Sequence, residues 1–86
     1  MTPARIYEEF RLLAERLEIR LLVDRGNFSG DYCVVGPDKY IVLNKHKPIE
    51  QRLKRFAAAF SQLDLNNMYI KPALRELIEA ARIEKI

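Results

Sequence analysis

Cysteine, histidine and long apolar runs are scarce in this chain of 86 residues. The single cysteine, Cys33, excludes an intramolecular disulfide, and with it the small secreted proteins that depend on such bonds. The single histidine, His46, leaves too few ligands for a structural zinc site, so we expect neither a metal nor another cofactor. No apolar run approaches the ~20 residues that cross a bilayer, and none near the start resembles a signal peptide. We therefore expect a cytoplasmic protein that does not enter membranes.

Glycine and proline are also few, with three and four residues, which excludes collagen-like and low-complexity chains. Hydrophobic residues make up 49% of the chain and charged residues 31%, a composition typical of globular rather than disordered proteins. A chain of this length has room for one small hydrophobic core, so we expect a single domain over residues 1–86.

Apolar residues recur with helical spacing in three segments and form short runs in three others. Helices are predicted from Pro3, Pro48 and Pro72, because proline suits the first turn of a helix. The middle helix has the clearest apolar stripe, which consists of Ile49, Leu53, Phe56, Phe60 and Leu63. Strands are predicted at residues 19–23, 32–35 and 40–43, with turn-forming residues between them.

The resulting order, α-β-β-β-α-α, predicts an α+β fold, because the strands are clustered and do not alternate with helices. Strands that follow one another usually pair, so we expect a three-stranded antiparallel sheet packed against the helices. Such a sheet has two edges, and an uncovered edge can pair with a second copy of the chain to give a homodimer.

Positive charge is concentrated in the middle of the chain. The net charge is +3, yet residues 39–55 alone carry +5, while residues 1–38 carry −2 and residues 56–86 carry zero. The cations of this segment are Lys39, Lys45, Lys47, Arg52, Lys54 and Arg55. The helix that begins at Pro48 adds free backbone amides, which favour an anion. The pattern predicts a non-enzymatic binding protein that presents a basic surface to an acidic protein partner.

Other interpretations of these residues stay open. The same cations can serve only for solubility, or Lys45, Lys47, Arg52 and Arg55 can contact the phosphates of a nucleic acid. An enzyme with a pocket around Cys33 and His46 is a further alternative, although a cysteine within a strand is usually buried and unreactive. Phe28, in the glycine-flanked loop 26–30, either contacts a ligand or folds back over the core.

One stretch of the chain resembles a known enzyme family. The predicted strand at residues 40–44 ends in asparagine and leads, through a polar connector, to Arg-Phe-Ala-Ala-Ala-Phe-Ser-Gln-Leu-Asp at residues 55–64. This frame resembles the zinc peptidases of the ImmA/IrrE kind, which have Arg-Phe-x-x-Ala-His-Glu-x-x-His on the corresponding helix. Phe60 and Asp64 stand in place of the ligand histidines, and Ser61 in place of the general-base glutamate. The resemblance implies a fold fragment without zinc and without catalysis. The order of elements also resembles small bacterial families of unassigned function.

Overall fold

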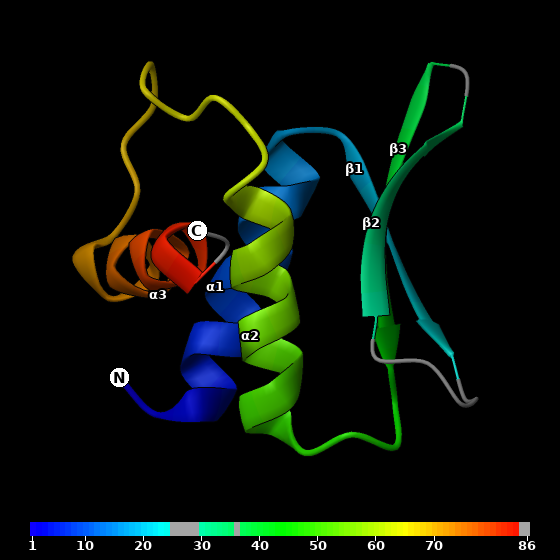
Figure 1. Ribbon diagram of the computed structural model, residues 1–86, viewed down its shortest axis with the longest axis horizontal. Helices are drawn as coiled ribbons and strands as arrows, with labels where there is room; N and C mark the ends of the chain where they lie inside the picture. Colours follow the sequence, from blue (N-terminus) through cyan, green and yellow to red (C-terminus); the bar gives the residue numbers. More distant parts are fainter. Residues whose placement is uncertain (25–29, 36, 85–86) are drawn as a thin grey trace.

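The computed structural model of the chain describes residues 1–24, 30–35 and 37–84, and the side chains of residues 1–24 and 37–83. In this part of the chain the helices and strands follow one another in the expected order (Figure 1). They are α1 (Pro3–Arg16), β1 (Ile19–Asp24), β2 (Gly30–Val35), β3 (Asp38–Asn44), α2 (Ile49–Phe60) and α3 (Pro72–Glu84). None of the described helices is long and apolar enough to cross a membrane.

Local signals define both ends of α1. The side chain of Thr2 accepts a hydrogen bond from the backbone N–H of Arg5 at 3.2 Å, and Pro3 occupies the first turn. At the other end, Leu17 caps the helix and Glu18 follows with a φ of 58°. This left-handed conformation is the usual way to leave a helix, but glycine adopts it at much lower cost than glutamate. The turn directs the chain into β1.

The sheet is mixed, with β3 in the middle and β1 and β2 on either side. β2 and β3 form an antiparallel hairpin, in which Val35 lies opposite Asp38. β1 runs parallel to β3, in a register that begins with Ile19 opposite Lys39. The prediction of an α+β fold with a three-stranded antiparallel sheet is therefore wrong, and the fold is mixed α/β.

The burial of β3 explains why this strand takes the central position. Its Ile41 and Leu43 are only 1% and 0% exposed beneath the helices, while Tyr40 and Val42, on the opposite face, are half-buried. A strand that is apolar on both faces gains from a neighbour on each side, whereas β1, which exposes Arg20, suits an edge. The prediction had placed β1 beside β2, because consecutive strands are usually neighbours.

The helices all lie on one side of the sheet (Figure 1). α1 and α2 pack directly on the strands, and α3 packs on these two helices, on the side away from the sheet. Within the described residues, α3 contacts α1 and α2 but no strand. The opposite face of the sheet is covered by none of the described helices, and it carries Leu22, Tyr40 and Val42.

Three phenylalanines form the centre of the core. Phe10 of α1 stacks on Phe56 and Phe60 of α2, with ring centroids 5.3 and 5.5 Å apart, and all three side chains are fully buried. Burial of each ring contributes roughly 1.5–3 kcal/mol to folding. α2 ends at Phe60, so Leu63 lies in the turn that follows and not in the helix as its spacing had predicted. Other buried residues come from every layer and include Ile41, Leu43, Ala57, Leu74 and Ile78.

Candidate functional site

The predicted basic segment does not stay together in the fold. Lys39 lies near the start of β3, whereas Lys45 and Lys47 follow the end of this strand. Because an extended chain advances about 3.3 Å per residue, roughly 20 Å of strand separates Lys39 from Lys45. The two ends of β3 lie at opposite ends of the sheet in Figure 1. Lys39 therefore cannot share a compact ligand with the other cations.

Arg52 belongs to the contact between α1 and α2. Its guanidinium carbon lies 5.1 Å from the centre of the Tyr7 ring, which itself packs edge-on against Phe56 with centroids 5.4 Å apart. The residue is half-buried, and its Nε is a buried atom without a hydrogen-bond partner among the described residues. A cation stacked in this way stabilises the helix pair, so the structure assigns Arg52 a role in packing.

Four cations remain, two in the connector before α2 and two in the middle of this helix. Lys45, Lys54 and Arg55 are exposed, Lys47 is half-buried, and we call these four residues the basic surface. Lys54 lies five residues into α2, about 8 Å along its axis from the connector that carries Lys45 and Lys47. Among the described residues, no carboxylate forms an ion pair with any of the four.

Several cations of α1 and near the two ends of α3, unlike those of the basic surface, form ion pairs with carboxylates of the same chain. The pairs are Arg5–Glu9, Arg11–Glu8, Arg11–Glu15, Lys71–Glu9 and Arg82–Glu79. Arg11 donates hydrogen bonds to Glu8, which lower the pKa of Glu8 and raise the pKa of Arg11. Charge is thus largely compensated along α1 and uncompensated on the basic surface.

The N-terminus of α2 adds to the positive potential of the basic surface. Its N-cap is Pro48, which forms no side-chain hydrogen bond to the first turn, and Glu50 is the acidic residue in that turn. Free N–H groups at a helix N-terminus carry partial positive charge, which adds to that of Lys45 and Lys47. An acidic side chain from outside would experience both contributions, reduced by the negative charge of Glu50 in the first turn.

The structure does not bring Cys33 and His46 together. The backbone of Cys33 lies opposite Tyr40, four residues or about 13 Å before Asn44 along β3. His46 is exposed beyond the end of that strand, and its backbone N–H donates to Oδ1 of the buried Asn44 at 2.9 Å. Phe28, and the side chain of Cys33, lie outside the described residues.

The positions that correspond to the peptidase motif do not form a metal site. Phe60 is fully buried in the core, and Asp64 is exposed beyond the end of α2. The hydroxyl of Ser61 donates to the carbonyl of Ala58 at 2.6 Å. Across the described ranges, no three residues of the kinds His, Cys, Asp and Glu lie close enough together to hold a metal ion.

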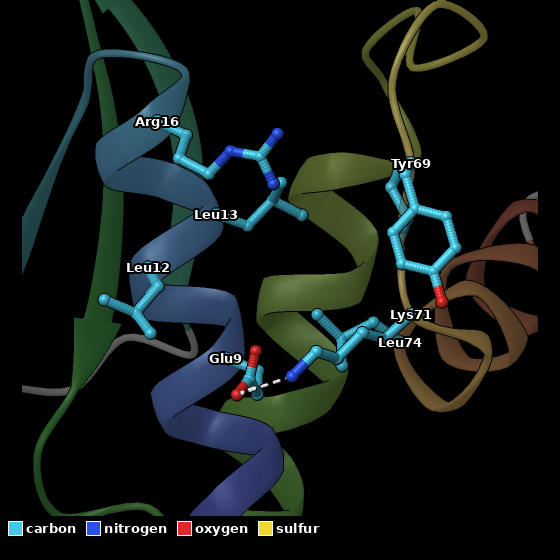
Figure 2. Close-up of a pocket in the computed structure, with 8 residues that line it drawn as sticks. Glu9, Leu12, Leu13, Arg16, Tyr69, Lys71 and Leu74 are labelled. Carbon is cyan, nitrogen blue, oxygen red and sulfur yellow. Dashed lines mark ion pairs between the residues drawn. The ribbon is translucent and has the colours of Figure 1, made fainter.

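A pocket of about 190 Å³ lies on another part of the surface, between α1 and the start of α3 (Figure 2). Its floor is apolar and consists of Leu13, Ile70 and Leu74, which are 3–5% exposed. Leu12 and Tyr69 stand at its rim, with 40% and 72% of their surfaces exposed. Arg16 and Tyr69 lie on opposite sides of the opening in Figure 2.

An ion pair closes one end of this pocket. Lys71 Nζ lies 3.0 Å from Oε1 of Glu9, and Arg5 Nε lies 3.3 Å from the same oxygen. Glu9 is thus shared between two cations, and only 13% of its side chain is exposed. Arg16, at the other end, has no ion pair among the described residues.

Sequence reasoning had missed the pocket, because its residues come from positions 9–16 and 69–74, more than fifty residues apart. The one local signal was Tyr69, an aromatic residue in the connection between α2 and α3. Comparison of the chain with models of protein families, with curated proteins and with solved structures gives no match. What the protein does must therefore be inferred from its own residues.

Proposed function

We propose that this protein is a non-enzymatic interaction protein, whose basic surface binds an acidic segment of a protein partner. The observation that carries the proposal is a group of four cations without ion pairs among the described residues: Lys45 and Lys47 before the N-terminus of α2, and Lys54 and Arg55 halfway along this helix. In contrast, Arg5 and Arg11 on α1 already form ion pairs with carboxylates of the same chain. Complementary charge at such a surface raises the rate of encounter and selects acidic partners.

An acidic polypeptide fits this surface better than a single-stranded nucleic acid. Proteins that hold single strands usually place exposed aromatic rings between their cations, so that bases can stack on them. In the described part of residues 38–60, Phe56 and Phe60 are fully buried and Tyr40 is half-buried on the sheet. Arg52, which the nucleic-acid interpretation needs, is stacked on Tyr7.

A non-enzymatic role is supported by the placement of the chain's most reactive residue types. The backbone of Cys33 in β2 lies opposite Tyr40, whereas His46 follows the end of β3, and this separation does not favour a thiol–imidazole pair. The basic surface itself consists of ammonium and guanidinium groups in contact with solvent, which suit binding by charge.

The proposal can be tested by fluorescence anisotropy with a labelled 20-residue polyglutamate as the probe, at 50 and 200 mM salt. The purified protein is compared with a Lys54→Ala/Arg55→Ala variant. The matched control is Arg20→Ala/Arg75→Ala, which removes the same charge from exposed residues outside the basic surface. We expect about tenfold weaker binding for the first variant, a smaller change for the control, and weaker binding at the higher salt.

Mixed-sequence RNA and DNA oligonucleotides are titrated in the same buffers. Binding of the oligonucleotides with a steep salt dependence, without binding of polyglutamate, would replace the proposal with a nucleic-acid function. Failure of all probes to bind at 50 mM salt, or equal losses in the two variants, would show that the basic surface serves solubility alone.

A further inference from the structure

The pocket between α1 and the start of α3 is a candidate for a second binding site, formed by residues outside the basic surface. None of its lining residues belongs to positions 39–55. The proposal for this pocket can therefore be tested independently of the proposal for the basic surface. We infer that this pocket receives a single large apolar side chain, aromatic or branched aliphatic, from an acidic peptide segment of a partner protein.

The size of the pocket sets the size of its occupant. A dry cavity of roughly 150 Å³ lined by aliphatic and aromatic side chains is enough to hold benzene. The pocket of about 190 Å³ thus has room for one ring or one branched aliphatic group, but not for a larger apolar surface. Its buried floor of Leu13, Ile70 and Leu74 supplies the apolar contacts that such a group would gain.

The charges around the opening determine what can flank that group. Glu9 is shared between Arg5 and Lys71, so its negative charge is already compensated. Together, Glu9 and the cations Arg5, Lys71 and Arg16 carry three positive charges and one negative charge. A carboxylate beside the apolar side chain would meet the unpaired guanidinium of Arg16, whereas a lysine or arginine there would be repelled.

The rim has the character of a protein-binding surface. Tyr69 is 72% exposed and Leu12 40% exposed, so both side chains expose apolar surface beside the opening. Tyrosine and arginine are the residue types that most often contribute strongly at protein interfaces. Tyr69 and Arg16 stand on opposite sides of the pocket, where each can contact a different part of a bound peptide (Figure 2).

The experiment follows backbone amide signals of the protein by NMR during titration with capped tripeptides. The probe has phenylalanine between two aspartates. One comparison peptide replaces the phenylalanine with alanine, and the other replaces both aspartates with lysine. We expect the probe to shift signals at residues 9–16 and 69–74, with a dissociation constant on the order of 0.1–1 mM. Each comparison peptide is expected to bind at least about fivefold more weakly.

Two variants test the assignment of the pocket. Arg16→Glu reverses the charge at the opening and should weaken the probe about five- to tenfold. Arg20→Glu makes the same change at an exposed arginine outside the pocket and should have little effect. Tyr69→Ser, in an exposed loop, should also weaken the probe and provides an independent variant if Arg16→Glu folds poorly.

Three results would overturn the inference: equal binding of the three peptides, equal effects of Arg16→Glu and Arg20→Glu, or shifts confined to residues outside the pocket. Pocket signals that move with protein concentration, without peptide, would instead identify a second copy of the chain as the occupant. Because Lys54→Ala/Arg55→Ala leaves the pocket intact, it should bind the tripeptide as the unmodified protein does. This comparison separates failure of the pocket from failure of the basic surface.

Discussion

Arg52 is the cation whose role the structure changes most, and its replacement gives a quantitative test. In the Arg52→Ala variant, α2 loses the guanidinium that stacks on Tyr7 at 5.1 Å and the half-buried stem of the side chain. A cation–π contact of this kind contributes roughly 0.5–1 kcal/mol. Each methylene of the stem contributes up to about 0.8 kcal/mol, and about half of that at half burial.

Two effects reduce this loss. The buried Nε has no partner, and its removal relieves a desolvation cost of about 1 kcal/mol. Alanine also has a slightly higher helix propensity than arginine. Alanine keeps Cβ, so two methylenes are lost, and the expected net loss is about 0.5 kcal/mol of unfolding free energy, which for a domain of this size lowers Tm by about 2–4 °C.

Urea denaturation monitored by circular dichroism measures this loss, with Lys54→Ala as the exposed control on the same helix. The control should change the unfolding free energy by less than Arg52→Ala does, because Lys54 is exposed. Arg52→Met keeps apolar contact with Tyr7 and removes the unpartnered Nε, so it should lose less than Arg52→Ala. Arg52→Ala should also keep most of the affinity for polyglutamate. Equal stability of Arg52→Ala and the unmodified protein, or a large loss of polyglutamate binding, would refute the role assigned to Arg52.

Three further predictions concern stability and can be measured by the same denaturation experiment. Glu18→Gly should raise the unfolding free energy by about 0.5–1 kcal/mol, because glycine adopts the φ of 58° without strain, whereas Glu18→Ala should change it little. Asn44→Ala should lower it by about 1–2 kcal/mol, because the buried amide oxygen that accepts from the His46 N–H is lost. Phe60→Ala should lower it by about 3–5 kcal/mol, because it leaves a cavity against Phe10 and Phe56.

Much of the local structure could be predicted from residues close together in the sequence. Pro3 indicated the start of α1, and the helix begins at this residue. The spacing of Phe56 and Phe60 indicated the buried face of α2, and both rings are fully buried. The hairpin of β2 and β3 likewise follows from two short apolar runs with a tight turn between them. These features depend on contacts between near neighbours, which periodicity and capping residues report directly.

The candidate sites could be predicted only in part. The excess of positive charge in residues 39–55 was visible from composition, but the chain divides it among three environments. Lys39 lies at the far end of β3, Arg52 stacks on Tyr7, and the basic surface keeps the remainder. Spacing along a helix could not distinguish Arg52 from Lys54, because the difference depends on a side chain of α1.

The position of β1 and the pocket were decided by the tertiary structure alone. β1 is joined to β2 in sequence but lies beside β3, because the side chains of β3 are more buried than those of β1 and gain more from a neighbour on each side. The pocket exists because α3 packs on α1 and brings Lys71 to Glu9, sixty-two positions earlier in the chain. Local patterns determine where helices and strands begin and which faces are apolar. The order of the strands and the shape of the surface depend on the sum of many distant contacts, which local patterns do not contain.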